Sequence, residues 1–346
     1  MRSLKDLMSA KRRGPSDLLG LDLGTTGAKA VRVHRSGESI TIQAADVFAP
    51  VDLDAVQGEG ALPAPVVVPA RLKARQACLV IPGRQAVIKL LSFPGHFEAQ
   101  DGSQRVVDGL GLSDPSKYRI AYKVTHEGAV RSGSESRVLA AAVREEEAHR
   151  AAMLLPAGLP VPHTIEVAGI AAMSAFLAGI GDDLPSRTVG MIEFGATMSH
   201  FALFHRGSLS LFRRFDFGVD RVLKNLSKTL GVDETTAAGI MVNGSFDVSH
   251  TIDETLGPIL KQLVVSRDFV ERRENCRLET VYACGGLALS HDVLETIRAS
   301  VGNDVKPWSP VDAFGFAAGA IPDTLEGAEW RLTAAIGACL GAMEEA

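Results

Sequence analysis

The sequence predicts an α/β protein made of two related lobes. The main observation is a block that reads as strand, glycine turn, strand, glycine turn and strand, and that occurs twice, at 18–47 and 188–217. The two copies lie close to half a chain apart, which indicates a duplication. The composition agrees, because 34 glycines and 5% aromatic residues in 346 favour a fold with many tight backbone turns.

Length and charge restrict the function classes. The chain is long enough for two or three domains, and 46% apolar with 22% charged residues excludes disorder over most of it. The net charge is -5, but residues 1–13 carry five basic residues and one acid, so the rest of the chain carries -9. An acidic body is a poor nucleic-acid binder, because phosphate contacts require a basic face.

The basic start, residues 1–16, has two interpretations. Leu4, Leu7 and Met8 form a small apolar stripe at helical spacing, and Lys11, Arg12 and Arg13 follow it. Such a leader can rest weakly on an anionic membrane surface or meet a protein partner. It can equally be a disordered, solubilising tail.

Cysteine usage and hydropathy indicate a soluble, cytoplasmic protein. Four scattered cysteines without a CxxC pair are typical of buried reduced thiols. The apolar stretch 167–180 is too short to span a bilayer and predicts a core helix, and no secretory signal is present. The nine histidines form no metal-binding motif, so they are expected to be structural.

The repeated turns carry the chemistry. Each copy places an acid two residues before a glycine, followed by threonine: Asp22, Gly24, Thr25 and Thr26 in the first, and Glu193, Gly195, Ala196 and Thr197 in the second. Glycine lets the backbone approach a ligand, exposed N–H groups and threonine hydroxyls can hold phosphate oxygens, and an acid at a strand end can hold Mg²⁺ through water. Two such hairpins predict a phosphate clamp between lobes, and the alternative is two ordinary tight hairpins.

A third element is the apolar strand 280–284, which runs into Gly285 and Gly286 and then a helix capped near Ser290 or His291. Because glycine has no side chain, a flat ring can lie directly on the backbone at Gly285 and Gly286. Taken alone, this element is better interpreted as a simple turn.

In this order, the three elements resemble the phosphate and adenosine motifs of the actin-like ATPase superfamily, which has a ribonuclease H-like fold. Within it the chain is similar to the FtsA-like PilM family of type IV pilus assembly proteins. Further matching segments are the following: Leu79–Pro94 with Pro82 and Gly83, Val138–Arg144, Leu154–Pro160, Ile165–Val167, Arg206–Gly207, Phe217–Asp220, Val305–Pro310 and Trp330–Leu340.

The resemblance implies domain limits: the leader 1–16, a first lobe at 17–72 and 141–187, an inserted subdomain at 73–140, and a second lobe at 188–346 whose helical part is 218–275. It also implies ATP and Mg²⁺ as cofactors. Asp22 and Glu193 would help to hold the metal, Gly24, Thr25, Thr26, Gly195, Ala196 and Thr197 would touch phosphates, and Gly285 and Gly286 would lie beside the adenosine. Glu166 would orient the attacking water.

Two departures from the family pattern affect these expectations. Glu193 stands where the family usually has aspartate, and its extra methylene moves the carboxylate about 1.5 Å further into a site that tolerates little misplacement. The segment 97–117 is rich in Gly, Asp and Ser where the family has a longer amphipathic helix, which implies a smaller subdomain or an altered partner surface. We therefore expect nucleotide binding with weak or absent hydrolysis.

The functional expectation is a cytoplasmic, ATP-binding scaffold, peripheral to the inner membrane, that docks the tail of a PilN-like inner-membrane protein. Other pilus assembly proteins, or a second copy of the chain, are further partners that the resemblance allows. The alternatives are an FtsA-like filament-forming protein, a type II secretion component, and a small-molecule kinase of the same superfamily.

Overall fold

The computed structural model describes residues 14–56, 60–61, 64–130, 133–181 and 184–344. The chain divides into two compact units. The first holds residues up to 82, 149–179 and 309 onward, and the second holds 83–148 and 180–308. Residues 1–13 of the expected leader lie outside the described residues.

The first unit contains a six-stranded sheet of order β14-β3-β2-β1-β4-β8. Its strands are β1 (Asp17–Asp22), β2 (Ala28–Ser36), β3 (Ser39–Phe48), β4 (Gln76–Ile81), β8 (Val161–Val167) and β14 (Gly315–Phe316). Its longer helices are α5 (Ala168–Gly179) and α10 (Thr333–Glu344), and its short ones are α2 (Leu53–Val56), η1 (Ala70–Leu72), η4 (Pro310–Asp312), η5 (Asp323–Leu325) and η6 (Glu329–Leu332).

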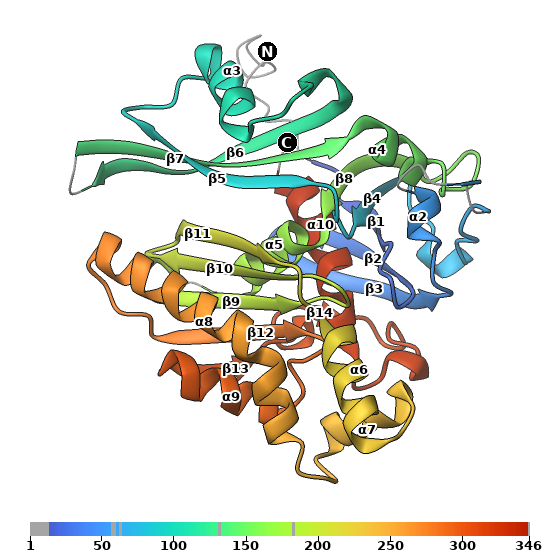
Figure 1. The fold of residues 1–346 in the computed structure, drawn as a ribbon. Helices are drawn as coiled ribbons and strands as arrows, with labels where there is room; N and C mark the ends of the chain where they lie inside the picture. Colours follow the sequence, from blue (N-terminus) through green and yellow to red (C-terminus); the bar gives the residue numbers. More distant parts are fainter. Residues whose placement is uncertain (1–13, 57–59, 62–63, 131–132, 182–183, 345–346) are drawn as a thin grey trace. The chain divides into compact units, whose positions relative to one another are not determined.

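The helices α5 and α10 pack on each other beside this sheet (Figure 1). Both are apolar on nearly every side, which is typical of helices that are buried all round. The buried helix expected at 167–180 is confirmed by α5.

The second unit contains a five-stranded sheet of order β11-β10-β9-β12-β13. Its strands are β9 (Thr188–Phe194), β10 (Ser199–His205), β11 (Ser208–Phe215), β12 (Thr280–Gly285) and β13 (Asp304–Pro307). Its helices are α6 (Val219–Leu230), α7 (Glu234–Asn243), α8 (Ser249–Glu274) and α9 (His291–Val301), and η3 (Leu184–Ser186) precedes β9. As expected, Ser290 caps α9 through the N–H of Val293.

The duplication is confirmed by strand topology. In the first sheet β1 pairs antiparallel with β2, β2 antiparallel with β3, β1 parallel with β4, and β4 parallel with β8. In the second, β9, β10, β11, β12 and β13 repeat these pairings in the same order. The two hairpins that carry the acid and glycine motifs therefore occupy equivalent positions in their sheets.

The insertion, residues 83–148, forms a three-stranded sheet of order β5-β7-β6 with α3 on one face (Figure 1). Its elements are β5 (Val87–Pro94), α3 (Ala99–Leu110), η2 (Pro115–Lys117), β6 (Tyr118–Val130) and β7 (Gly133–Arg144), and α4 (Glu145–Ala152) follows. The segment 97–117, which is rich in Gly, Asp and Ser, therefore contains the 12-residue helix α3. Two of its glycines serve close packing, because a Cβ on Gly102 would lie 2.4 Å from the Phe97 ring and one on Gly109 would lie 2.8 Å from Leu91.

The compact units differ from the domain limits that the sequence suggests. Residues 309–346 belong to the first unit, because α10 is apolar all round and is buried against α5 and the first sheet. The insertion belongs to the second unit, although it interrupts the first-lobe half of the chain. Among the described residues, no helix is both long and apolar enough to span a membrane.

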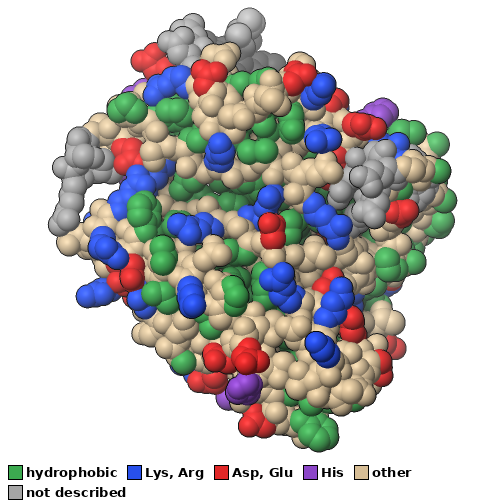
Figure 2. Space-filling view, in the orientation of Figure 1, with side chains coloured by type: hydrophobic (Ala, Val, Ile, Leu, Met, Phe, Trp, Pro, Cys, Tyr) green, Lys and Arg blue, Asp and Glu red, His purple; other side chains and the backbone are tan. Residues whose placement is uncertain are grey.

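Charge is unevenly distributed on the surface. Figure 2 shows Lys and Arg side chains lying among hydrophobic ones at several places on the viewed face. The net charge of -5 therefore does not exclude local sites for anions.

Candidate phosphate-binding hairpins

The first hairpin joins β1 to β2 and contains a buried ion pair. Asp22 and Lys29 are directly opposite each other across the hairpin, and both are 7% exposed. The Lys29 Nζ lies 3.6 Å from Oδ2 of Asp22. A buried charge is tolerated only with such compensation, so the acid at the strand end is accompanied by a cation of its own hairpin.

Gly24 lies directly over this pair. A Cβ at that position would lie 2.3 Å from the Lys29 Nζ and 3.5 Å from Oδ2 of Asp22, so the space above the ammonium group depends on glycine. Thr25 is half-buried and Thr26 is exposed, and Arg331 Nη2 donates to the Thr26 carbonyl at 3.5 Å. The turn therefore presents backbone, hydroxyls and two cationic side chains, a donor set that suits a phosphate group.

The second hairpin joins β9 to β10 and has an equivalent pair. Glu193 and His200 are directly opposite each other, and the His200 Nδ1 lies 2.9 Å from Oε2 of Glu193. His200 is 4% exposed, and within the described part of the chain its Nε2 has no hydrogen-bond partner. The imidazole therefore holds the Glu193 carboxylate toward the hairpin itself.

The N-terminus of α6 fixes the turn of this second hairpin. The N–H groups of Val219 and Asp220 donate to the carbonyls of Gly195 and Ala196 at 3.0 and 2.9 Å. A Cβ on Gly218 would lie 2.2 Å from the Ala196 carbonyl oxygen, so the approach requires glycine. Partial burial raises the pKa of Asp220, against the opposing effect of Lys224.

Gly285 and Gly286 lie in the same corner of the second unit. Gly285 has φ +85°, and a Cβ on it would lie 2.3 Å from the Phe194 carbonyl oxygen. Gly286 donates its N–H to that oxygen at 2.9 Å, and a Cβ on Gly286 would lie 2.6 Å from Val219. Close packing of β12, β9 and α6 thus requires glycine at both positions, and it brings them to the turn at Gly195.

The neighbouring Cys284 is not a reactive thiol. It is buried opposite Glu193 in the β12–β9 pairing, and burial raises its pKa well above the ordinary value, with a further contribution from that carboxylate. Since the thiolate is the reactive form, Cys284 is a packing residue.

Glu166 lies in the sheet of the first unit, next to α10. It lies on β8 level with Val80, which is itself level with Asp22 on β1. Its Oε1 is 3.1 Å from where a Cβ on Gly341 of α10 would lie. The carboxylate is therefore adjacent to α10.

Lys29 and His200 are site residues that the motifs alone do not predict. Each lies seven residues after its acid, Asp22 and Glu193, and this equal offset is the signal in the repeat that could have identified them. Hairpin register, rather than any recognised motif, places them opposite the acids. Among the described residues there is no group of three or more potential metal ligands.

Residues 118–343 match the family model described as type IV pilus assembly protein PilM. This chain belongs to the PilM family. The family model covers the last two strands of the insertion and the second unit's sheet and helices. From the first unit it covers β8, α5, β14 and nearly all of α10.

Solved structures agree with the fold of this PilM-family chain. A chain from a PilM–PilN type IV pilus biogenesis complex superposes with a TM-score of 0.73, at 17% identity, over 95% of this chain and all of that one. Weaker likenesses include ethanolamine utilization protein EutJ from Carboxydothermus hydrogenoformans (TM-score 0.44, 15% identity, 94% and 90% of the two chains). Another is MreB 5 of Spiroplasma citri bound to AMPPNP (0.41, 12%, 84% and 91%). With its duplicated sheets, the chain has the actin-like ATPase fold that its motifs predict.

Proposed function

We propose that this PilM-family protein is a nucleotide-binding scaffold of type IV pilus assembly that docks the tail of a PilN-like inner-membrane protein. The observation that carries the proposal is family membership combined with two equivalent hairpins, each with a glycine turn over a buried acid–base pair. A solved protein of this fold forms a complex with PilN, which supports the same class of partner here. Family membership favours this function over the filament-forming, type II secretion and small-molecule kinase alternatives.

The proposed nucleotide is ATP, with its phosphates at the two turns. Lys29 and Arg331 supply positive charge at the first turn, and Thr25, Thr26 and Thr197 supply hydroxyls. Gly285 and Gly286 expose backbone in the corner beside the second turn, where the adenosine is proposed to lie.

Asp22 and Glu193 fit Mg²⁺ in the limited sense that the ion needs only one or two carboxylates and keeps several waters. When bound, Mg²⁺ would neutralise phosphate charge. Asp22 is accompanied by Lys29, and Glu193 is bound by His200, so each carboxylate is oriented before any cation arrives.

We propose that hydrolysis is weak. The His200 contact holds Glu193 toward its own hairpin, and the longer glutamate side chain replaces the family's aspartate. Glu166 is the proposed water-orienting residue, and its position against α10 supports no strong activity. The test of this role is turnover in the Glu166→Gln variant, which we expect to fall below the already low wild-type rate. A rate equal to that of wild type would contradict the role.

The nucleotide proposal is tested by ATP affinity, with Mg²⁺, in wild type, Asp22→Ala and Glu193→Asp. We expect Asp22→Ala to weaken binding of ATP with Mg²⁺ about tenfold or more, because it removes the carboxylate that is proposed to hold the hydrated ion and that pairs with Lys29. Glu193→Asp is expected to bind more tightly than wild type, because the shorter side chain leaves more room for a hydrated cation. Thermal shifts measure both effects, and exposed Asp253→Ala on α8 is the matched control. Equal shifts in all four proteins would contradict the phosphate-binding role.

The partner proposal is tested with a synthetic peptide that corresponds to the cytoplasmic tail of a PilN-like protein. We expect saturable binding by titration calorimetry, tighter in ATP than without it, because a ligand favours the conformation to which it binds better. A scrambled peptide of the same composition is the control. Absence of binding in both conditions would count against the scaffold function. This partner would bring the protein to the cytoplasmic face of the inner membrane.

A further inference from the structure

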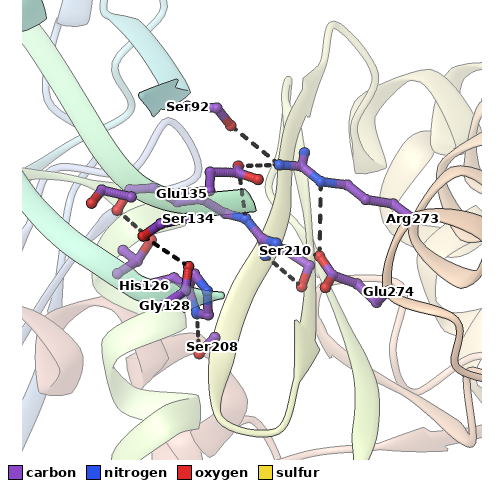
Figure 3. A network of polar contacts seen from close by, with 12 residues as sticks. Ser92, His126, Gly128, Ser134, Glu135, Ser208, Ser210, Arg273 and Glu274 are labelled. Atoms are coloured by element: carbon purple, nitrogen blue, oxygen red, sulfur yellow. Dashed lines mark hydrogen bonds and ion pairs between the residues drawn. The ribbon is translucent and has the colours of Figure 1, made fainter. Parts of the chain in front are cut away.

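A buried polar cluster fastens the insertion to the second lobe, and Figure 3 shows it at close range. We name it the Arg137 joint. From the insertion it includes Ser92 on β5 with Glu135 and Arg137 on β7. From the second lobe it includes Ser210 on β11 with Arg273 and Glu274 at the end of α8.

Arg137 is the centre of this joint. It is 1% exposed, and its guanidinium lies 2.6 Å from Oε1 of Glu274, 3.1 Å from Oγ of Ser210 and 3.3 Å from Oε1 of Glu135. Two of these three partners belong to the second lobe. A fully buried arginine is retained only with such compensation, so this side chain keeps β7 against both β11 and α8.

The second cation closes the cluster. Arg273 pairs with Glu135 and donates to Ser92 at 3.3 Å, and its guanidinium lies 5.8 Å from the centre of the Phe269 ring. Two arginines and two glutamates therefore alternate across the boundary, with no net charge. Each of the four ions contacts more than one partner. Breaking one contact would therefore leave buried charges with too few partners, and we expect the whole joint to open at once.

Strand β11 is attached to the insertion at both ends. Near its start, Ser208 lies 3.3 Å from Nδ1 of His126 on β6. Near its end, Arg214 donates to the carbonyls of Gly83 and Ala86, at 3.2 and 2.8 Å. The turn at 83–86, which opens the insertion, is therefore held by the same strand that contributes Ser210 to the joint.

The register of the second sheet connects this strand to the candidate phosphate hairpin. Arg214 on β11 is directly opposite His200 on β10, and His200 is directly opposite Glu193 on β9. Residues opposite one another in adjacent strands share a face of the sheet. A row of three polar side chains thus runs from the carbonyls of the turn at 83–86 to the acid of the second hairpin.

We propose that the insertion and the second lobe form one cooperative body, and that nucleotide at the second hairpin changes the stability of the insertion through β11. The cooperative body follows from the joint alone. The response to nucleotide rests on the proposed function, because it requires that the second hairpin binds phosphate. A partner that binds the insertion would then be regulated by nucleotide, since coupling between two sites is reciprocal.

Hydrogen exchange of the full chain, read by mass spectrometry across a series of urea concentrations, tests the cooperative body. In wild type we expect peptides from β7 and β10 to exchange with the same urea dependence, because they open together. The double variant Arg137→Met with Glu274→Leu replaces one positive and one negative side chain by apolar side chains. We then expect β7 to exchange at least tenfold faster while β10 is unchanged.

The matched control replaces an exposed pair of the second lobe, Asp304→Ala with Lys306→Ala, and is expected to behave as wild type. Should the double variant fail to fold, Ser210→Ala removes only the hydroxyl that accepts from Arg137 and serves the same comparison. Independent urea dependences of β7 and β10 in wild type would overturn the cooperative body.

Addition of ATP and Mg²⁺ to the same samples tests the response. We expect slower exchange at 83–86 and in β7 of wild type, and no change there in the double variant. If ATP raises the melting temperature but exchange in the insertion is unchanged, the coupling is refuted while nucleotide binding stands. If ATP gives no thermal shift, the proposed nucleotide binding and its coupling both fail, and the urea series alone decides whether the cooperative body exists.

Discussion

Replacement of Gly337 by alanine is expected to destabilise the first unit by about 3 kcal/mol or more. Gly337 lies in α10, where a Cβ would lie 1.8 Å from the carbonyl oxygen of Ala171 and 2.9 Å from the amide nitrogen of Ala175, both on α5. The clash is with backbone, so no rotamer change relieves it and the two helices must separate. Urea unfolding followed by circular dichroism measures the loss.

The control for this prediction is Gly239→Ala in α7. This glycine is also helical, but a Cβ there meets no atom within 4 Å. Alanine is the better helix former, so this change is expected to stabilise by about 0.5–1 kcal/mol. If Gly337→Ala lowers the free energy of unfolding while Gly239→Ala raises it, the loss in the first variant is due to helix packing and not to helix propensity. A Gly337→Ala protein as stable as wild type would contradict the contact between α5 and α10.

Replacement of Gly218 by alanine is expected to reduce ATP affinity about 100-fold, since a 1 Å misplacement in a preorganised site has effects of that size. Gly218 has an extended backbone, with φ -155° and ψ -176°, that alanine also adopts, so the effect is steric. Its Cβ would lie 2.2 Å from the carbonyl oxygen of Ala196, which α6 holds through Asp220. The substitution therefore displaces the turn of the second hairpin. Titration with a fluorescent ATP analogue measures the loss.

The control for Gly218→Ala is Gly257→Ala in α8, where a Cβ meets no atom within 4 Å. We expect wild-type ATP affinity and a slightly higher melting temperature. Unchanged affinity in Gly218→Ala, with a folded protein, would show that the turn at Gly195 and Ala196 does not bind phosphate. It would leave the fold and the family membership intact.

Several site features are predictable because they depend on short-range pairing. Asp22 and Gly24 belong to one hairpin, Glu193 and Gly195 to another, and the repeated pattern is enough to identify both. The acid–base pairs are implicit in the same register. Gly285 shows the opposite case, since its positive φ and its contact with Phe194 depend on the parallel pairing of β12 with β9.

Composition is a weaker guide in the insertion. The segment 97–117 is rich in glycine, but Gly102 and Gly109 lie in α3, where they allow the helix to approach Phe97 and Leu91. Glycine lowers helix propensity by about 1 kcal/mol per residue, and burial of an apolar face can outweigh that cost. Whether burial outweighs helix propensity depends on the sheet against which α3 packs. That sheet is built from β5, which precedes the helix in the sequence, and from β6 and β7, which follow it.

Local sequence is sufficient for the duplicated hairpins, the resemblance to the actin-like superfamily and the cap of α9, because these features depend on residues that are close together in the chain. The three-dimensional fold was needed to assign α10 to the first unit and the insertion to the second. Those assignments depend on surfaces contributed by distant segments. Arg137 meets Glu274, and Gly337 meets Ala171, and no local pattern encodes either contact.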